Sequence, residues 1–226
     1  YSKESKKEYL MTIGKAVLDG HNNFVLINDD VVIKGLISSG VEECDARMYV
    51  SGGCQETMIE GYGHTEGAGI YVSAVRIFDL FLRSGNFDEF IKPIDSADSF
   101  EEFYQKFINT AKNFITRVLK GRNTRQFFNK DILPCPLFSV TQKGCVECGK
   151  DYQKGGAKYN FTTVALVGLG TLADSLFAIK TLVYDQKRLT LEELNRVLSN
   201  NWEGSESLRT EAIALSKYGH NEREID

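Results

Sequence analysis

The stretch SGGCQETMIEGYGHTEGAG, residues 51–69, contains six glycines, three glutamates, one histidine and one cysteine between two apolar segments. A strand is expected immediately before it, and in α/β folds ligands bind in the loops at the carboxyl ends of strands. Cys54 and Glu56 are two residues apart, so in extended backbone their side chains project from the same face. Such a pair can act on adjacent carbons of one substrate, with the thiol abstracting from one carbon and the carboxylate moving a proton at the next. A Cys-x-Glu pair also arises by chance, so the rest of the sequence has to decide whether this is a site.

The composition is that of a globular protein without a nucleic-acid or membrane partner. The 226 residues are 42% hydrophobic and 26% charged, which is typical of folded domains. The net charge is -4 and no long basic run occurs, which argues against binding to nucleic acid or to anionic membranes. No apolar run approaches the roughly 18 residues that a membrane span needs. The N-terminal sequence YSKESKKEYL does not resemble a secretory signal, and the five cysteines indicate reduced thiols, so a cytoplasmic protein is expected.

Cys145 and Cys148 form a C-x-x-C pair, which can bind zinc or take part in thiol exchange. A structural zinc site needs two more ligands at suitable spacing, and only Cys135 lies nearby. The favoured interpretation is therefore a pair of partly buried helix thiols, and no metal is expected.

Hydrophobic periodicity and helix caps predict alternating strands and helices. Parallel strands are expected at residues 24–27 and 48–50. Helices are expected at residues 10–18, 31–40, 41–47, 70–85, 99–119, 137–148, in the apolar stretch 164–185 and from residue 190. Capping boxes at Ser99 and Thr190 begin two of these helices. Residues 121–136 are expected to be irregular, because two of the three prolines fall there. The predicted fold class is therefore α/β with a mainly parallel, buried sheet.

Several blocks of the sequence, in order, closely resemble the glycyl radical enzymes, the family that includes pyruvate formate-lyase and the radical dehydratases and lyases. The block INDDVVIKGLISSGVEECDARMYVSGGCQE, residues 27–56, resembles the family's loop that carries the thiyl-radical cysteine in G-C-x-E. KGCVECGKDYQKGGAKYNFT, residues 143–162, resembles a segment with G-x-x-x-x-G-K-D followed by G-G-A-K-Y-N. TLADSLFAIKTLVYDQKRLTLEELNRVLSNNWEG, residues 171–204, and LSKYGHNEREID, residues 215–226, resemble the helices and the turn that follow. The resemblance covers nearly the whole chain.

The resemblance implies a fold and a set of roles. The fold is a ten-stranded β/α barrel. In this family an activating enzyme with an iron–sulfur cluster and S-adenosylmethionine makes a radical on a glycine, so no cofactor is expected to bind directly. That radical passes to the loop cysteine, which by position is Cys54, and the cysteine abstracts hydrogen from a small-molecule substrate. Glu56 matches the general base of the dehydratases and lyases, and His64 and Tyr71 are expected to contact the substrate. The resemblance further implies an anaerobic, cytoplasmic enzyme that is a homodimer when full length.

The reaction class stays open between two branches of the family. The Cys-x-Glu pair resembles the eliminases, so the first expectation is a dehydratase or lyase that acts on a small polyol, amino alcohol or similar substrate. Gln55 and Thr57 stand where that branch usually has valine and proline, which is closer to the arylacetate decarboxylases. Residues 155–160, GGAKYN, again resemble the eliminases more closely. Pyruvate cleavage is disfavoured, because Gly53 stands where pyruvate formate-lyase has a second cysteine.

The radical glycine itself is expected beyond this sequence. The family motif R-V-x-G-Y, or a close variant, should follow well after the turn near residue 219, whereas the sequence ends at Asp226. We therefore expect residues 1–226 to be the central barrel segment of a longer enzyme, inactive alone and lacking the radical glycine segment. The alternative is a non-catalytic segment that pairs with a chain carrying the radical glycine.

Overall fold

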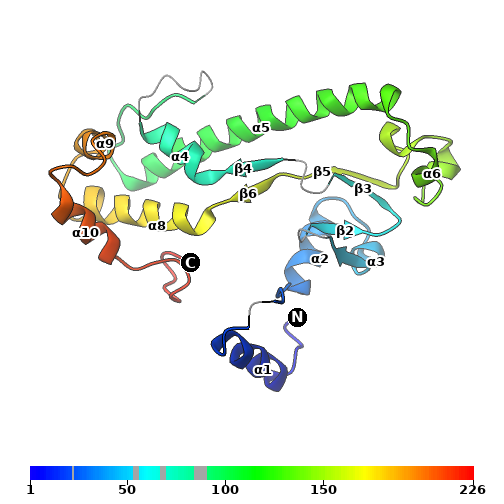
Figure 1. Cartoon of the computed structure of the whole chain (residues 1–226), viewed down its shortest axis with the longest axis horizontal. Helices are drawn as coiled ribbons and strands as arrows, with labels where there is room; N and C mark the ends of the chain where they lie inside the picture. The colour runs from blue at the N-terminus through cyan, green and yellow to red at the C-terminus, as the bar shows by residue number, and fades with distance from the viewer. Residues whose placement is uncertain (22, 53–55, 67–69, 84–90) are drawn as a thin grey trace. The chain divides into compact units, whose positions relative to one another are not determined.

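The computed structural model describes residues 1–21, 23–52, 56–66, 70–83 and 91–226, which form a mixed α/β structure (Figure 1). The chain divides into two compact units. The first unit comprises Tyr1–Ala68 and Gln126–Thr163, and the second comprises Gly69–Arg125 and Val164–Asp226. The long helix α5, Phe100–Ile132, passes from the second unit into the first.

The first unit carries the sequence stretch with Cys54 and Glu56. Besides the end of α5, its elements are α1 (Lys7–Leu18), α2 (Asp29–Ser38), α3 (Glu43–Ala46), β1 (Tyr49–Ser51), β2 (Thr57–Ile59), β3 (Gly63–Glu66), α6 (Pro136–Ser139), α7 (Cys145–Cys148), the 3-10 helix η1 (Tyr152–Lys154) and β5 (Tyr159–Thr162). β1 pairs antiparallel with β2, and β3 pairs parallel with β5. Their small core centres on Val41, Ala46 and Ile59.

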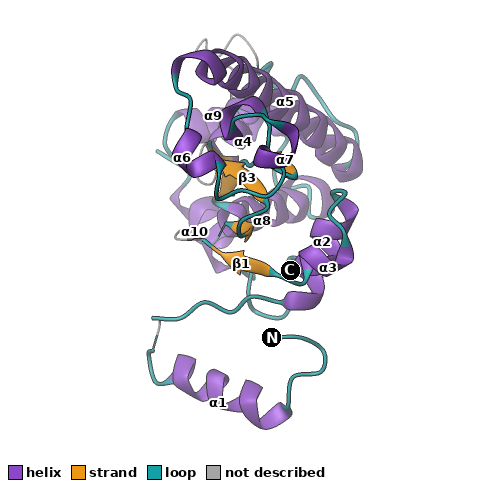
Figure 2. Cartoon of the chain, turned by 90° about the vertical axis from the view of Figure 1, so that its right-hand side faces the viewer, coloured by secondary structure: helices purple, strands orange, loops and turns teal. Residues whose placement is uncertain are grey.

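The second unit has the larger hydrophobic core. Its elements are β4 (Tyr71–Ser73), α4 (Ala74–Leu82), most of α5, β6 (Ala165–Val167), α8 (Leu169–Ile179), the π-helix η2 (Lys180–Asp185), α9 (Leu191–Ser199) and α10 (Glu206–Ala214). β4 and β6 form a parallel pair, and Figure 2 shows how small the strands are beside the helices. Phe78 and Phe81 of α4 pack edge-on against Phe103 of α5 at ring-centroid distances of 6.1 and 5.5 Å. Phe103 is fully buried, so this aromatic contact holds α4 against α5.

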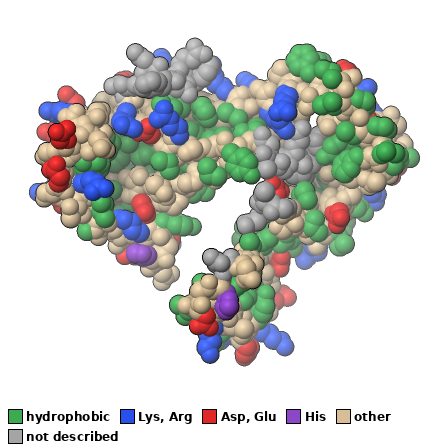
Figure 3. Space-filling view, viewed as in Figure 1, with side chains coloured by type: hydrophobic (Ala, Val, Ile, Leu, Met, Phe, Trp, Pro, Cys, Tyr) green, Lys and Arg blue, Asp and Glu red, His purple; other side chains and the backbone are tan. Residues whose placement is uncertain are grey.

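A second group of apolar side chains lies at the surface of the first unit. Hydrophobic side chains gather over the end of α5 and over α6 (Figure 3). Phe127, Phe128 and Leu137 are 61%, 59% and 86% exposed, so they contribute little to the core. Within the described ranges, no helix combines the length and the apolar character that crossing a membrane requires.

Several local expectations are confirmed. Helices α1, α2 and α3 lie where periodicity predicted them. At the start of α9, the Thr190 hydroxyl accepts a hydrogen bond from the Glu193 N–H, and the Glu193 carboxylate accepts one from the Thr190 N–H, as the capping box predicted. The Ser99 hydroxyl likewise accepts from the Glu102 N–H, although the Glu102 carboxylate accepts from the N–H of Asp98 and not of Ser99.

The prediction of two parallel strands, at residues 24–27 and 48–50, is wrong. Residues 24–27 form no strand, and Phe24, Val25 and Leu26 are exposed, because this short apolar run has no partner strand in the described part of the chain. The other strand exists as β1, but its partner β2 is antiparallel to it. Only residues 52–56 connect the two strands, and a parallel pair needs a crossover of about a dozen residues or more.

The expected extent of three helices is also corrected. The helix expected from residue 70 begins at Ala74, after β4, and the Ser73 hydroxyl caps it by accepting from the Arg76 N–H. The segment expected to be irregular is helical as far as Ile132, since Pro134 ends the helix without disturbing the turns before it. The expected helix at 137–148 is split into α6 and α7, which are separated by residues 140–144; Gly144, just before α7, has φ 99°.

Candidate active site

Glu56 lies immediately before β2, the second strand of the hairpin formed by β1 and β2. Ser51 pairs with Thr57, and the next pair is joined by a hydrogen bond of 2.8 Å from the Gly52 N–H to the Glu56 carbonyl. Residues 53–55, which include Cys54, lie outside the described residues. The expectation that Cys54 and Glu56 share one face accordingly stays a prediction. The glycine-rich stretch 51–69, interpreted as a loop that follows a strand, contains two further strands, β2 and β3.

The carboxylate of Glu56 approaches the backbone of Gly52 closely. A β-carbon at position 52 would lie 2.9 Å from Oε2 of Glu56 and 3.1 Å from the terminal methyl of Met58. A contact below 3.0 Å forces a neighbour to move, so a larger residue at position 52 would displace the carboxylate. Glu56 is half-buried at the point where β2 begins. Glycine at position 52 therefore leaves room for Glu56 beside the hairpin connection.

The two expected substrate-contacting residues fall in different units. His64 is in β3, and its backbone is in register with Asn160 of β5. Tyr71 begins β4, in register with Ala165, and its side chain is 59% exposed. His64 belongs to the first unit with Glu56, whereas Tyr71 belongs to the second. Their expected contact with a substrate stays a prediction.

A polar cluster around the buried Asp45 lies at the base of the hairpin. Asp45 of α3 accepts hydrogen bonds from the Lys158 ammonium and from the Tyr159 hydroxyl, both at 2.7 Å and both on Oδ2. Lys158 also lies 3.1 Å from a carboxylate oxygen of Glu42. The Tyr159 hydroxyl in turn accepts from the Glu42 N–H at 3.2 Å. We call Asp45, Lys158 and Tyr159 the Asp45 cluster; it joins residues that are 113 and 114 positions apart.

The Asp45 cluster favours one charge state. The hydrogen bond from Lys158, and then that from Tyr159, lower the pKa of Asp45 below the ordinary value of 3.8. The bond to Asp45 raises the pKa of Lys158, and burial, followed by the bond to Asp45, raises that of Tyr159. The cluster therefore holds an ionised carboxylate, an ammonium and a neutral phenol at neutral pH.

This charge state predicts how stability depends on pH. Because the pKa of Asp45 is lowered by folding, its ionised form stabilises the native state above the unfolded value near 3.8, and this contribution is lost as the pH falls through the lower folded value. Asp45→Asn should therefore unfold at lower denaturant concentration than the unchanged protein at pH 7, and the difference should narrow below pH ~4. Denaturant titrations at both pH values measure this. Glu43→Gln, which alters an exposed ion pair on the same helix, should show little difference at either pH. If the denaturant concentrations at which Asp45→Asn and the unchanged protein unfold differ by the same amount at both pH values, the account is contradicted.

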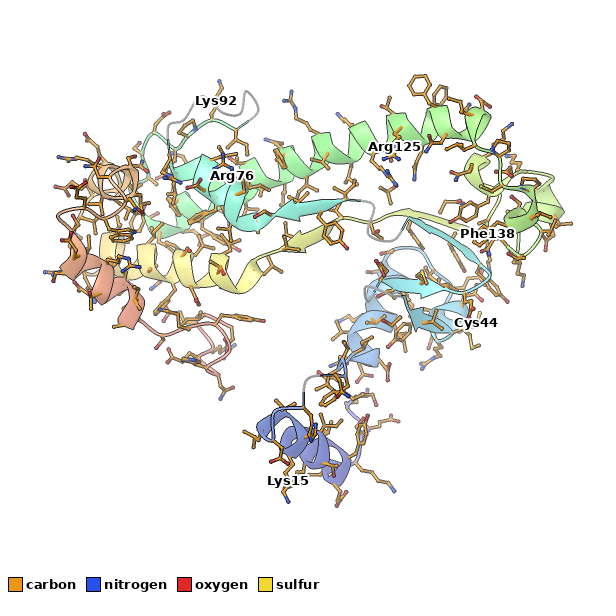
Figure 4. The ribbon with its side chains drawn as sticks, in the orientation of Figure 1. Lys15, Cys44, Arg76, Lys92, Arg125 and Phe138 are labelled. Atoms are coloured by element: carbon orange, nitrogen blue, oxygen red, sulfur yellow. The ribbon has the colours of Figure 1, made fainter. Side chains whose placement is uncertain are left out.

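The cysteines do not form a metal centre in the described part of the chain. Cys145 is buried and Cys148 is exposed, and burial raises the pKa of the Cys145 thiol. Both thiols lie on the short helix α7, as expected, and the absence of a metal stays a prediction. The one group of possible metal ligands among the described residues is Glu42, Cys44 and Asp45. Asp45 is already bound to Lys158, and Cys44, labelled in Figure 4, is exposed on α3, so this group gives no reason to expect an ion.

The sequence pattern did not single out Asp45 or Lys158. Both lie within blocks that resemble the family, D-A-R at residues 45–47 and A-K-Y at 157–159, so the blocks were recognised without the contact between them. The hydroxyl of Tyr159 is hydrogen-bonded to Asp45 of α3 and to Glu42 just before that helix, so Tyr159 braces this part of the fold.

Known proteins resemble this chain over most or all of its length. The family model described as Pyruvate formate lyase-like matches residues 1–226. Trans-4-hydroxy-L-proline dehydratase of Clostridioides difficile is 31% identical over 234 residues, and the match covers 100% of this chain. The 4-hydroxyphenylacetate decarboxylase glycyl radical subunit of the same species is 23% identical over 232 residues, covering 89% of this chain and 25% of that protein. The solved structure of a glycyl radical enzyme from Archaeoglobus fulgidus superposes with a TM-score of 0.85 at 26% identity, covering all of this chain.

The match covers only part of each relative. The chain spans 29% of the length of the dehydratase and 29% of the chain in the Archaeoglobus structure. The family match over residues 1–226 and the fold of the described residues both point to the same family of proteins. This chain belongs to the pyruvate formate lyase-like family of glycyl radical enzymes.

Proposed function

We propose that this chain supplies the hydrogen-abstracting cysteine and the general base of a glycyl radical eliminase, a dehydratase or lyase of small polyols, amino alcohols or similar substrates. The observation that carries the proposal is the hairpin that holds Glu56 two residues after Cys54, in a chain whose relatives include a dehydratase at 31% identity. The radical glycine supplies the unpaired electron to the cysteine and lies outside this sequence.

The proposed reaction proceeds in three steps. The sulfur of Cys54 takes a hydrogen atom from a substrate carbon that bears a hydroxyl or a similar group, which leaves a carbon radical and a thiol. Glu56 takes the proton of that hydroxyl, so the ketyl-like radical expels the leaving group from the neighbouring carbon. The resulting radical takes the hydrogen atom back from Cys54. For a diol the products are an aldehyde and water, with the hydroxide neutralised by the proton that Glu56 received.

A second candidate is arylacetate decarboxylation. It is favoured by Gln55 and Thr57 around Glu56 and by the similarity to the decarboxylase subunit. In that reaction Glu56 would handle the proton of a phenol or of the substrate carboxyl group. The two candidates therefore share Cys54 and Glu56 and differ in which bond breaks.

The products distinguish the two candidates. The activated enzyme that carries this segment is incubated separately with trans-4-hydroxy-L-proline, with 1,2-diols and amino alcohols, and with 4-hydroxyphenylacetate. We expect water, ammonia or another leaving group to be eliminated from at least one hydroxylated substrate, with no carbon dioxide from the arylacetate. Carbon dioxide from the arylacetate, with no elimination from any hydroxylated substrate, would establish the decarboxylase in place of the eliminase.

The proposal includes the remainder of the enzyme. Residues 1–226 form the central segment of a ten-stranded β/α barrel, and the radical glycine lies in another part of the polypeptide or in a partner chain. An activating enzyme with an iron–sulfur cluster and S-adenosylmethionine installs the radical, and the full-length enzyme is a cytoplasmic homodimer. The similarity of the chain to the Archaeoglobus glycyl radical enzyme supports the barrel, because the superposition extends over the entire segment.

A further inference from the structure

We propose that the Asp45 cluster is a positioning element that fixes the base of the β1–β2 hairpin and thereby sets the place of Glu56 during turnover. This inference rests on the proposed function, since it assigns these residues an effect on the reaction through the hairpin and not through the substrate.

The cluster is connected to the first strand of the hairpin through α3. Asp45 is 9% exposed, and its carbonyl accepts a hydrogen bond from the Met48 N–H at 3.0 Å. Met48 immediately precedes β1. The neighbouring Ala46 is fully buried against the small core that also contains Ile59 of β2. A movement of Asp45 is therefore transmitted to both strands of the hairpin within a few residues.

The cluster is connected to the second strand through β5. The Tyr159 N–H donates to the Tyr62 carbonyl at 2.9 Å, and Tyr159 is in register with Gly63 of β3. Only residues 60–62 separate β3 from β2. The Tyr159 ring also stacks on Phe161 at 6.2 Å, and both rings pack against the core around Ile59. Tyr159 thus binds the segment after the hairpin through its backbone N–H, and it binds α3, which precedes the hairpin, through its hydroxyl.

This double attachment explains why two donors, the Lys158 ammonium and the Tyr159 hydroxyl, share one carboxylate oxygen of the buried Asp45. A buried carboxylate without partners is strongly destabilising, and here it is satisfied by Tyr159 of β5 and by Lys158 just before that strand, both far away in the sequence. The helix α3, which precedes the hairpin, and the turn at residues 60–62, which follows it, are therefore both hydrogen-bonded to Tyr159 of β5. The open end of the hairpin is fixed, and Glu56 lies at its other end.

Two substitutions test the proposal in the activated enzyme that carries this segment. Asp45→Asn removes the charge, and Tyr159→Phe removes one hydroxyl while it leaves the Asp45–Lys158 pair in place. We expect both to lower kcat, Asp45→Asn on the order of 100-fold, because a misplacement of about 1 Å can cost that much, while KM and the glycyl radical content stay close to those of the unchanged enzyme. Glu43→Gln on the same helix is the matched control and should leave kcat unchanged.

A readout independent of activity is the alkylation of Cys54. In the enzyme before activation, mass spectrometry of iodoacetamide-treated protein gives the rate at Cys54, with exposed Cys148 as the internal reference. Asp45→Asn and Tyr159→Phe should change the Cys54 rate relative to Cys148, and Glu43→Gln should not. If Asp45→Asn fails to fold, Tyr159→Phe alone decides.

The outcomes separate this inference from the proposed function. A kcat and a Cys54 alkylation rate that are both unchanged in Tyr159→Phe would overturn the positioning role. A parallel loss of radical content and of kcat would also overturn it, because a merely structural cluster predicts that result. Activity that survives Cys54→Ser would instead overturn the proposed function.

Discussion

Replacing Cys54 with serine is expected to abolish turnover while the glycyl radical still forms. Serine has nearly the same size as cysteine, but its O–H bond is too strong for a glycyl radical to take the hydrogen. The radical therefore stays on the glycine, and no substrate hydrogen is abstracted. Product formation by the activated enzyme measures the first effect, and spin counting by electron paramagnetic resonance measures the second.

The control for this substitution is Cys148→Ser. Cys148 is an exposed thiol of α7, and we expect its replacement to change neither turnover nor radical content. Turnover that persists in Cys54→Ser would remove the thiol from the mechanism. Loss of turnover in Cys148→Ser as well would indicate a general sensitivity to cysteine replacement.

Replacing Glu56 with glutamine is expected to lower kcat by about 10²- to 10⁴-fold, the range typical of a lost general base. Glutamine keeps the size of the side chain and its place beside Gly52, where Oε2 of Glu56 lies 2.9 Å from the position of a β-carbon. It cannot accept a proton, so the substrate radical forms but expels its leaving group slowly. Steady-state kinetics on the substrate identified by product analysis measures the effect.

Glu60→Gln provides the matched control, because Glu60 is an exposed carboxylate just after β2. We expect it to react like the unchanged enzyme. Equal kcat values for Glu56→Gln and Glu60→Gln would show that Glu56 is a solvated carboxylate with no part in proton transfer.

The parts of the fold that sequence predicted are those decided by neighbouring residues. The capping box at Thr190 and Glu193 depends on four consecutive residues, and it forms as expected. The helices of the first 46 residues follow from apolar spacing in the same way. The apolar run at 24–27 failed as a strand, because a strand needs a partner and local sequence does not reveal one.

The parts that sequence did not predict depend on distant contacts. β3 lies in a glycine-rich stretch that reads as a loop, and it becomes a strand by pairing with β5, nearly 100 residues away. In the Asp45 cluster, Asp45 likewise binds two residues that lie 113 and 114 positions further along the chain. Of the candidate site, Cys54 and Glu56 are proposed from the motif, whereas the contacts of Asp45 with Lys158 and Tyr159 could not be predicted from sequence.

The measurement that tests the central claim most directly is freeze-quenched electron paramagnetic resonance of the activated enzyme mixed with ¹³C-labelled substrate. In the unchanged enzyme we predict that the glycyl signal decreases as a carbon-centred radical with ¹³C coupling, or labelled product, accumulates. In Cys54→Ser we predict an undiminished glycyl signal with neither the labelled radical nor labelled product. A ¹³C-coupled substrate radical in Cys54→Ser would contradict the claim that Cys54 carries the radical to the substrate.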